Sequence, residues 1–86
     1  MSQGARIEGR VLDGAGHPLA DATVMIVDSE KPHRDIALLT DRHGRFCFTD
    51  LEPGGYTLAA LSPDGKSMQV STRVPPGGSV AVLLTP

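Results

Sequence analysis

The amino-acid sequence predicts an all-β domain, an antiparallel sandwich or barrel of seven strands. Short runs of apolar and β-branched residues recur about every 10–12 residues, which is typical of such folds. Ten Gly and seven Pro separate these runs rather than forming one tract. No run has the apolar period of an amphipathic helix. At 86 residues the chain is long enough for one domain, residues 1–86, with a single small core.

The first two expected strands lie on either side of a Gly-rich turn. Residues 5–13 alternate between apolar and charged side chains, which predicts a strand with one buried face. The Asp-Gly dipeptide at 13–14 ends this strand. Residues 21–28 are rich in β-branched side chains and predict the second strand.

The third and fourth expected strands flank the loop 41–44 and form a predicted hairpin. The loop ends in Gly, which suits a turn that needs a positive φ. In this register Leu39 lies opposite Phe46, and Ala37 lies opposite Phe48. Because paired residues share a face of a sheet, all four side chains are expected to point into the core.

The last three expected strands follow turns that are rich in Gly and Pro. Residues 68–74 alternate cleanly between apolar and polar side chains, and residues 80–85 form an apolar run. In full, the strands are expected at residues 5–13, 21–28, 36–40, 45–49, 56–61, 68–74 and 80–85. The expected core consists of Val24, Ile26, Phe46, Phe48, Tyr56, Leu58, Val70, Val80 and Val82.

Charge and composition exclude several classes of function. The net charge is -2 and the arginines are scattered among acidic residues, whereas a nucleic-acid-binding protein gathers its basic residues on one face. No apolar run approaches the length of a membrane span. The N-terminal residues lack the basic and then apolar order of a signal peptide. We therefore expect a cytoplasmic protein, or an extracytoplasmic one if a signal has been removed.

A single cysteine and three histidines are the residues that bear most on chemistry. Cys47 cannot form an intramolecular disulfide and is expected on the outer side of a sheet, between two inward phenylalanines. His17, His33 and His43 fall in separate loops, without the spacing of metal ligands. We therefore expect no catalytic residue, no cofactor and no metal site. A small metal-binding protein or enzyme that uses these histidines remains the alternative.

Several short motifs occur in a recognisable order along the chain. They are I-x-G-x-V at 7–11, D-x-x-G-x-P-L at 13–19, A-x-V at 22–24, T-D-x-x-G-x-F at 40–46, and a segment from Leu to Tyr at 51–56. In these motifs the chain resembles the carboxypeptidase regulatory-like domains, transthyretin-like sandwiches related to the collagen-adhesin B-type repeats. The resemblance implies a seven-stranded antiparallel Greek-key β-sandwich and an accessory domain of a bacterial protein. The Tyr-Arg-Gly-Ser sequence of the transthyretin-like hydrolases of urate breakdown does not occur, so their activity is not expected.

These observations predict a non-catalytic protein-interaction, adaptor or spacer module. A transthyretin-like oligomer that carries a small ligand is a further alternative. Contiguous exposed apolar surface marks protein interfaces, and on the expected register several apolar side chains face outward. The candidate interface consists of Met25, Val27, Ile36, Leu38 and Leu83. It is expected to bind a protein partner or a second copy, and Leu38→Asp is expected to abolish association without unfolding the domain.

Overall fold

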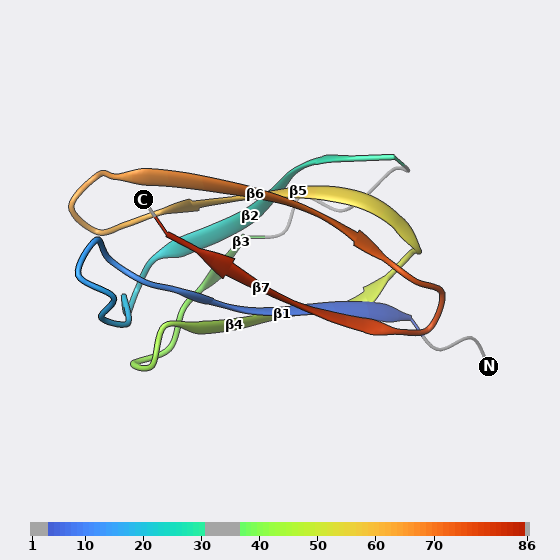
Figure 1. The fold of residues 1–86 in the computed structure, drawn as a ribbon, viewed down its shortest axis with the longest axis horizontal. Coiled ribbons are helices and arrows are strands. Elements are labelled where there is room, and N and C mark those ends of the chain that lie inside the picture. The colour runs from blue at the N-terminus through green and yellow to red at the C-terminus, as the bar shows by residue number, and fades with distance from the viewer. Residues whose placement is uncertain (1–3, 31–36, 86) are drawn as a thin grey trace.

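Two β-sheets face each other across the core in the computed structural model, which describes residues 4–30 and 37–85 (Figure 1). One sheet has the strand order β4-β1-β7 and the other the order β3-β2-β5-β6. The strands are β1 Ala5–Val11, β2 Thr23–Ser29, β3 Ala37–Leu39, β4 Arg45–Leu51, β5 Gly54–Leu61, β6 Ser67–Val74 and β7 Ser79–Leu84. The described residues contain no helix. The prediction of an all-β sandwich of seven strands is confirmed.

One strand pair departs from the antiparallel arrangement that the sequence predicts. β1 is antiparallel to β4 but parallel to β7, with Ile7 beside Val80 and Val11 beside Leu84. Parallel neighbours need a long connection between them. Here the rest of the chain supplies it, because the intervening strands contribute to both sheets before β7 returns to the side of β1. The three-stranded sheet is therefore mixed.

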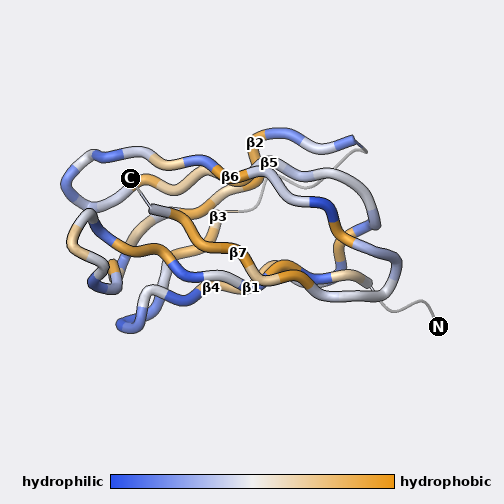
Figure 2. The backbone as a smooth tube through the Cα atoms, in the orientation of Figure 1, coloured by the Kyte–Doolittle hydropathy of each residue, from blue (hydrophilic) through white to orange (hydrophobic). Residues whose placement is uncertain are grey.

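The core lies between the two sheets and agrees closely with the prediction. Of the nine predicted core residues, all are buried except Val70, Val80 and Val82, which are half-buried against the core. The rings of Phe46 and Phe48 meet edge to face, with centroids 5.9 Å apart. Figure 2 shows hydrophobic stretches along the strands and hydrophilic residues at the turns. The alternation read from the sequence therefore places most strand faces correctly.

The predicted hairpin between residues 37 and 48 is wrong. β3 pairs with β2, with Leu39 beside Thr23, whereas β4 pairs with β1 in the other sheet. A local turn does form at 41–45, where Asp41 N–H donates to the Arg45 carbonyl oxygen at 3.1 Å. The chain uses this turn to cross from one sheet to the other, so Leu39 and Ala37 do not lie opposite the phenylalanines.

The facing of β3 is consequently reversed from the prediction. Leu38 is half-buried and packs against the core, while Ala37 and Leu39 are exposed. The cause is Thr40, whose N–H donates to the Ala22 carbonyl oxygen at 3.0 Å and whose carbonyl accepts from Asp21 N–H at 3.1 Å. These bonds to the loop before β2 hold β3 in the register that turns Leu38 inward.

Candidate functional site

The outer face of the three-stranded sheet carries a shallow groove of about 570 Å³. Its middle is formed by residues that lie side by side on the three strands. Arg10 lies between Arg45 and Leu83, and in the next row Glu8 lies between Cys47 and Ala81. We call this feature the groove and define it by Glu8, Arg10, Arg45, Cys47, Ala81 and Leu83.

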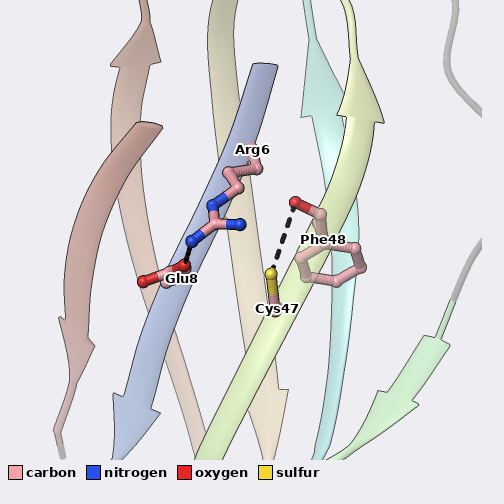
Figure 3. Close-up of polar contacts among 4 residues, drawn as sticks. All are labelled: Arg6, Glu8, Cys47 and Phe48. Carbon is pink, nitrogen blue, oxygen red and sulfur yellow. Dashed lines mark hydrogen bonds and ion pairs between the residues drawn. The ribbon is translucent and has the colours of Figure 1, made fainter. Parts of the chain in front are cut away.

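Two arginines set the charge of the groove. Arg10 and Arg45 are direct cross-strand neighbours, and like charges in such positions repel each other. Neither makes an ion pair with another residue among residues 4–30 and 37–85. The one glutamate of the groove, Glu8, instead accepts a hydrogen bond from Arg6 on the same strand (Figure 3). Asp41 also lines the groove and interacts electrostatically with Arg45, so charges of both signs lie at this end of the groove.

Cys47 faces outward in the groove, as the sequence predicts. The thiol is exposed, and its Sγ lies 4.0 Å from the carbonyl oxygen of Phe48 (Figure 3). Its cross-strand neighbour is Glu8, which is already paired with Arg6. A catalytic thiol needs an adjacent base that is in turn oriented by a third group. Within residues 4–30 and 37–85, the contacts of Cys47 do not include such a base.

The loop histidines lie apart from one another in sequence and belong to different connections. His17 lies between β1 and β2, where its Nδ1 is 3.9 Å from Oδ2 of Asp13, and His43 lies between β3 and β4. His33 is outside the described residues. Within the described part of the chain, no group of three His, Cys, Asp or Glu side chains is placed to hold a metal ion. The alternative of a histidine metal site therefore has no ligand set in that part.

A second surface, on the outer side of the four-stranded sheet, is uncharged and largely apolar. In its first row Thr23 lies between Leu39 and Leu61, and in its second row Met25 lies between Ala37 and Ala59. Val27 follows on β2 at the bulge between Ile26 and Asp28. We call this surface the apolar face and define it by Met25, Val27, Ala37, Leu39, Ala59 and Leu61.

Three large hydrophobic side chains of the apolar face are exposed to solvent. Leu39 is 66% exposed, Leu61 46% and Val27 44%. Together they make up three of the four large hydrophobic residues that are exposed in the described structure. The polar side chains of β6, including Gln69 and Arg73, lie beside this surface. An apolar centre next to a polar border is the general anatomy of a protein-binding surface.

The five residues of the predicted interface do not form one cluster. Met25 and Val27 do lie on the apolar face, but Leu38 points into the core and Leu83 belongs to the groove on the other sheet. Ile36 lies outside the described residues. The prediction missed Ala37 and Leu39, because the incorrect hairpin register turned them inward.

The family model of the carboxypeptidase regulatory-like domain matches residues 6–85. The chain belongs to this family. The resemblance seen in the sequence motifs is thereby confirmed over almost the whole chain. A comparison with curated proteins gives no match.

Solved structures share the fold of this carboxypeptidase regulatory-like domain at low sequence identity. A DUF3823 family protein from Parabacteroides merdae has a TM-score of 0.70 at 18% identity, over 99% of this chain and 46% of that one. A proposed carbohydrate-binding protein from Pseudomonas aeruginosa has a TM-score of 0.68 at 18% identity, over 99% and 90%. The 5-hydroxyisourate hydrolase of Klebsiella pneumoniae has a TM-score of 0.63 at 20% identity, over 100% and 89%.

At these identities the likeness shows the fold alone, a transthyretin-like β-sandwich. The domain spans less than half the length of the first of these structures. No helix in the described residues is long and apolar enough to cross a membrane.

Proposed function

We propose that this domain is a non-catalytic module that binds a protein partner through the apolar face. The observation that carries the proposal is the gathering of Val27, Leu39 and Leu61 on one outer sheet face. Scattered exposed hydrophobic residues are ordinary, whereas a contiguous exposed group marks an interaction surface. Family membership supports an accessory role of this kind.

The size of the apolar face suits a modest interface. Complete burial of a leucine or valine side chain stabilises by about 1.5–3 kcal/mol, and these side chains are about half exposed in the free domain. Their burial by a partner must also offset the loss of translational and rotational freedom. The apolar face therefore favours reversible docking rather than permanent association.

Carbohydrate binding is a competing function, because it is the activity proposed for the structural neighbour from Pseudomonas aeruginosa. Exposed aromatic rings commonly form the platform of a sugar site. The chain has no Trp, and Phe46, Phe48 and Tyr56 are its only aromatic residues. All three are buried in the core. The side chains of the domain therefore support a protein partner better than a sugar.

A capture experiment tests the proposal. Tagged domain is used to capture binding proteins from its native cells, in parallel with L39D and with T49D as the control. Leu39 lies in the apolar face, whereas Thr49 is exposed on β4 in the other sheet. We expect a partner that is retained by the wild type and by T49D and lost with L39D. Capture that L39D leaves unchanged, or no specific capture at all, would refute a docking role for the apolar face.

Titration with zinc and copper separates this function from the metal-binding alternative. Stoichiometric binding that is lost when His17, His33 and His43 are all replaced by Ala would favour the alternative. A protein-binding module is expected to show no such binding.

A further inference from the structure

The four edge strands of the two sheets are unequally protected against pairing with another chain. Edges are commonly protected by shortness, by charged residues, by Pro and by bulges. β3 has only three residues, β4 carries Arg45 and Asp50, and β6 carries Arg73, which is ion-paired with Glu30 at 2.5 Å. β7 has six residues, no charge and no Pro, and it pairs with β1 in an unbroken register. Among these edges β7 alone lacks every one of these protective features.

Two hydrogen bonds at the ends of the β1–β7 ladder show how the backbone of β7 is oriented. Arg6 N–H donates to the Gly78 carbonyl oxygen at 3.0 Å, and Leu12 N–H donates to the Leu84 carbonyl oxygen at 2.9 Å. In a parallel ladder every second residue bonds to the neighbouring strand. Residues 80, 82 and 84 therefore face β1. The N–H and C=O groups of residues 79, 81 and 83 point toward the open edge, where no strand of the described chain pairs with them.

The core is also incompletely covered along this side of the sandwich. Val80 and Val82 on β7 face inward but are only half-buried, and Val70 on β6 is in the same state. These three make up most of the half-buried hydrophobic residues that adjoin the core in the described structure. β6 and β7 are the outer strands of the two sheets on this side, and β7 is hydrophobic along most of its length (Figures 1 and 2). A further strand beside β7 would cover these valines.

We propose that the open edge of β7 is a strand-addition site whose occupant is β7 of a second copy of this chain. An edge that pairs with itself about a two-fold axis does so in the antiparallel sense, as one isologous interface. Because β7 carries no charge, self-pairing sets no like charges opposite each other. Apolar residues then meet apolar residues on both faces of the joined sheet. Such pairing gives partners to the backbone groups of residues 79, 81 and 83 and extends cover over Val80 and Val82.

Amide hydrogen exchange combined with sedimentation velocity tests this proposal directly. In dilute protein, the amides of Ala81 and Leu83 should exchange freely, while those of Val82 and Leu84 are protected by β1. As the concentration rises, the sedimenting mass should double and the amides of Ala81 and Leu83 should become protected in step. A protein that stays monomeric at every concentration would overturn the proposal, even if the edge accepts a synthetic apolar peptide. A dimer in which both amides still exchange freely would overturn it as well.

Two substitutions of Ala81 distinguish the contribution of its backbone N–H from that of its side chain. Ala81→Pro removes an outward N–H and leaves the bonds to β1 intact, so we expect loss of the dimer and an unchanged melting temperature in dilute solution. Ala81→Ser keeps the N–H and should still dimerise. If Ala81→Pro fails to fold, Leu83→Lys replaces it. Leu83 is 53% exposed on this edge strand, and a lysine on an edge strand disfavours pairing with a further strand. Dimerisation that survives both Ala81→Pro and Leu83→Lys would refute pairing through β7.

This inference is independent of the proposed function, because the two surfaces lie on different sheets. L39D should leave the β7 dimer intact, and Ala81→Pro should leave partner capture by the apolar face intact. Failure of one proposal is therefore distinguishable from failure of the other.

Discussion

Thr40 is a buried polar residue that ties the β3 end to the loop before β2. Its hydroxyl donates to the Leu19 carbonyl oxygen at 2.6 Å and accepts from Ala22 N–H at 2.9 Å. Thr40→Val keeps the shape of the side chain but leaves both backbone groups without their partner. We expect the free energy of unfolding, measured by urea denaturation, to fall by about 1–3 kcal/mol. Thr49→Val, at an exposed position of β4, is the matched control and should change it by less than about 0.5 kcal/mol. Equal effects at the two positions would contradict this role of Thr40.

Gly9 is a second residue whose identity follows from its surroundings. A Cβ at this position would lie 2.5 Å from Cζ of Phe46 and 2.8 Å from Cγ2 of Val82. The ring of Phe46 thus occupies the space beside β1 that a larger residue would need. We expect Gly9→Ala to lower the free energy of unfolding by about 1–3 kcal/mol through overpacking. Gly14→Ala is the control, because a Cβ there meets nothing within 4 Å. If Gly9→Ala proves as stable as Gly14→Ala, the Phe46 ring does not pack against β1 as described.

At the scale of the elements, the sequence is informative where a strand alternates and uninformative where it does not. β1 and β6 alternate, so their inward residues were predictable from the chain alone. β3 is a run of three apolar residues, and a slip of one residue reverses its faces. Its true register depends on the distant contacts of Thr40, which no local pattern reveals. The candidate site was only partly predictable for a similar reason, because the sheet to which Leu83 belongs is decided by the non-local pairing of β7 with β1.

The register of β3 makes a testable distinction between two adjacent leucines. Leu38 packs against the core, whereas Leu39 points outward from the apolar face. Leu38→Asp buries a charge and should lower the free energy of unfolding by several kcal/mol, to the point of unfolding a domain of this size. Leu39→Asp should change it by no more than about 0.5 kcal/mol. Urea denaturation of the two variants measures both effects. If Leu39→Asp proved less stable than Leu38→Asp, the register of β3 described here would be contradicted.

At the scale of the whole molecule, the two outer faces of the sandwich differ in character. The groove side carries the charged residues of β1, whereas the apolar face of the other sheet carries none. Because β7 lies in the sheet of the groove, a dimer joined through β7 leaves both apolar faces free. Such a dimer would present two docking surfaces, and two linked sites bind a multivalent target more tightly than one.

Carboxylates at three turns accept hydrogen bonds that lower their pKa values. Asp41 accepts hydrogen bonds from the N–H groups of Arg45 and His43 at 2.9 and 2.8 Å, and Asp13 accepts in the same way from His17 and Ala15. The bond from Arg45 N–H is the main cause that lowers the pKa of Asp41 below its ordinary value of 3.8, and the bond from His17 N–H has the same effect on the pKa of Asp13. At the β5–β6 turn, the Ser62 hydroxyl bonded to Asp64 is the main cause that lowers the pKa of that carboxyl group.

These lowered pKa values fix the direction of the pH dependence. Each carboxyl has a lower pKa in the folded than in the unfolded chain, so the unfolded chain takes up protons first as the pH falls. The stabilisation is therefore fully present above the unfolded value of 3.8, and it is lost as the pH falls through the lower folded values. We expect the melting temperature, followed by circular dichroism, to hold from neutral pH down to about pH 4 and to decline below it. In Asp41→Asn the melting temperature should depend less on pH in this range. The amide oxygen can still accept the hydrogen bonds from His43 N–H and Arg45 N–H, but the side chain no longer takes up a proton. A wild-type slope in Asp41→Asn would show that the Asp41 carboxylate does not contribute to the decline.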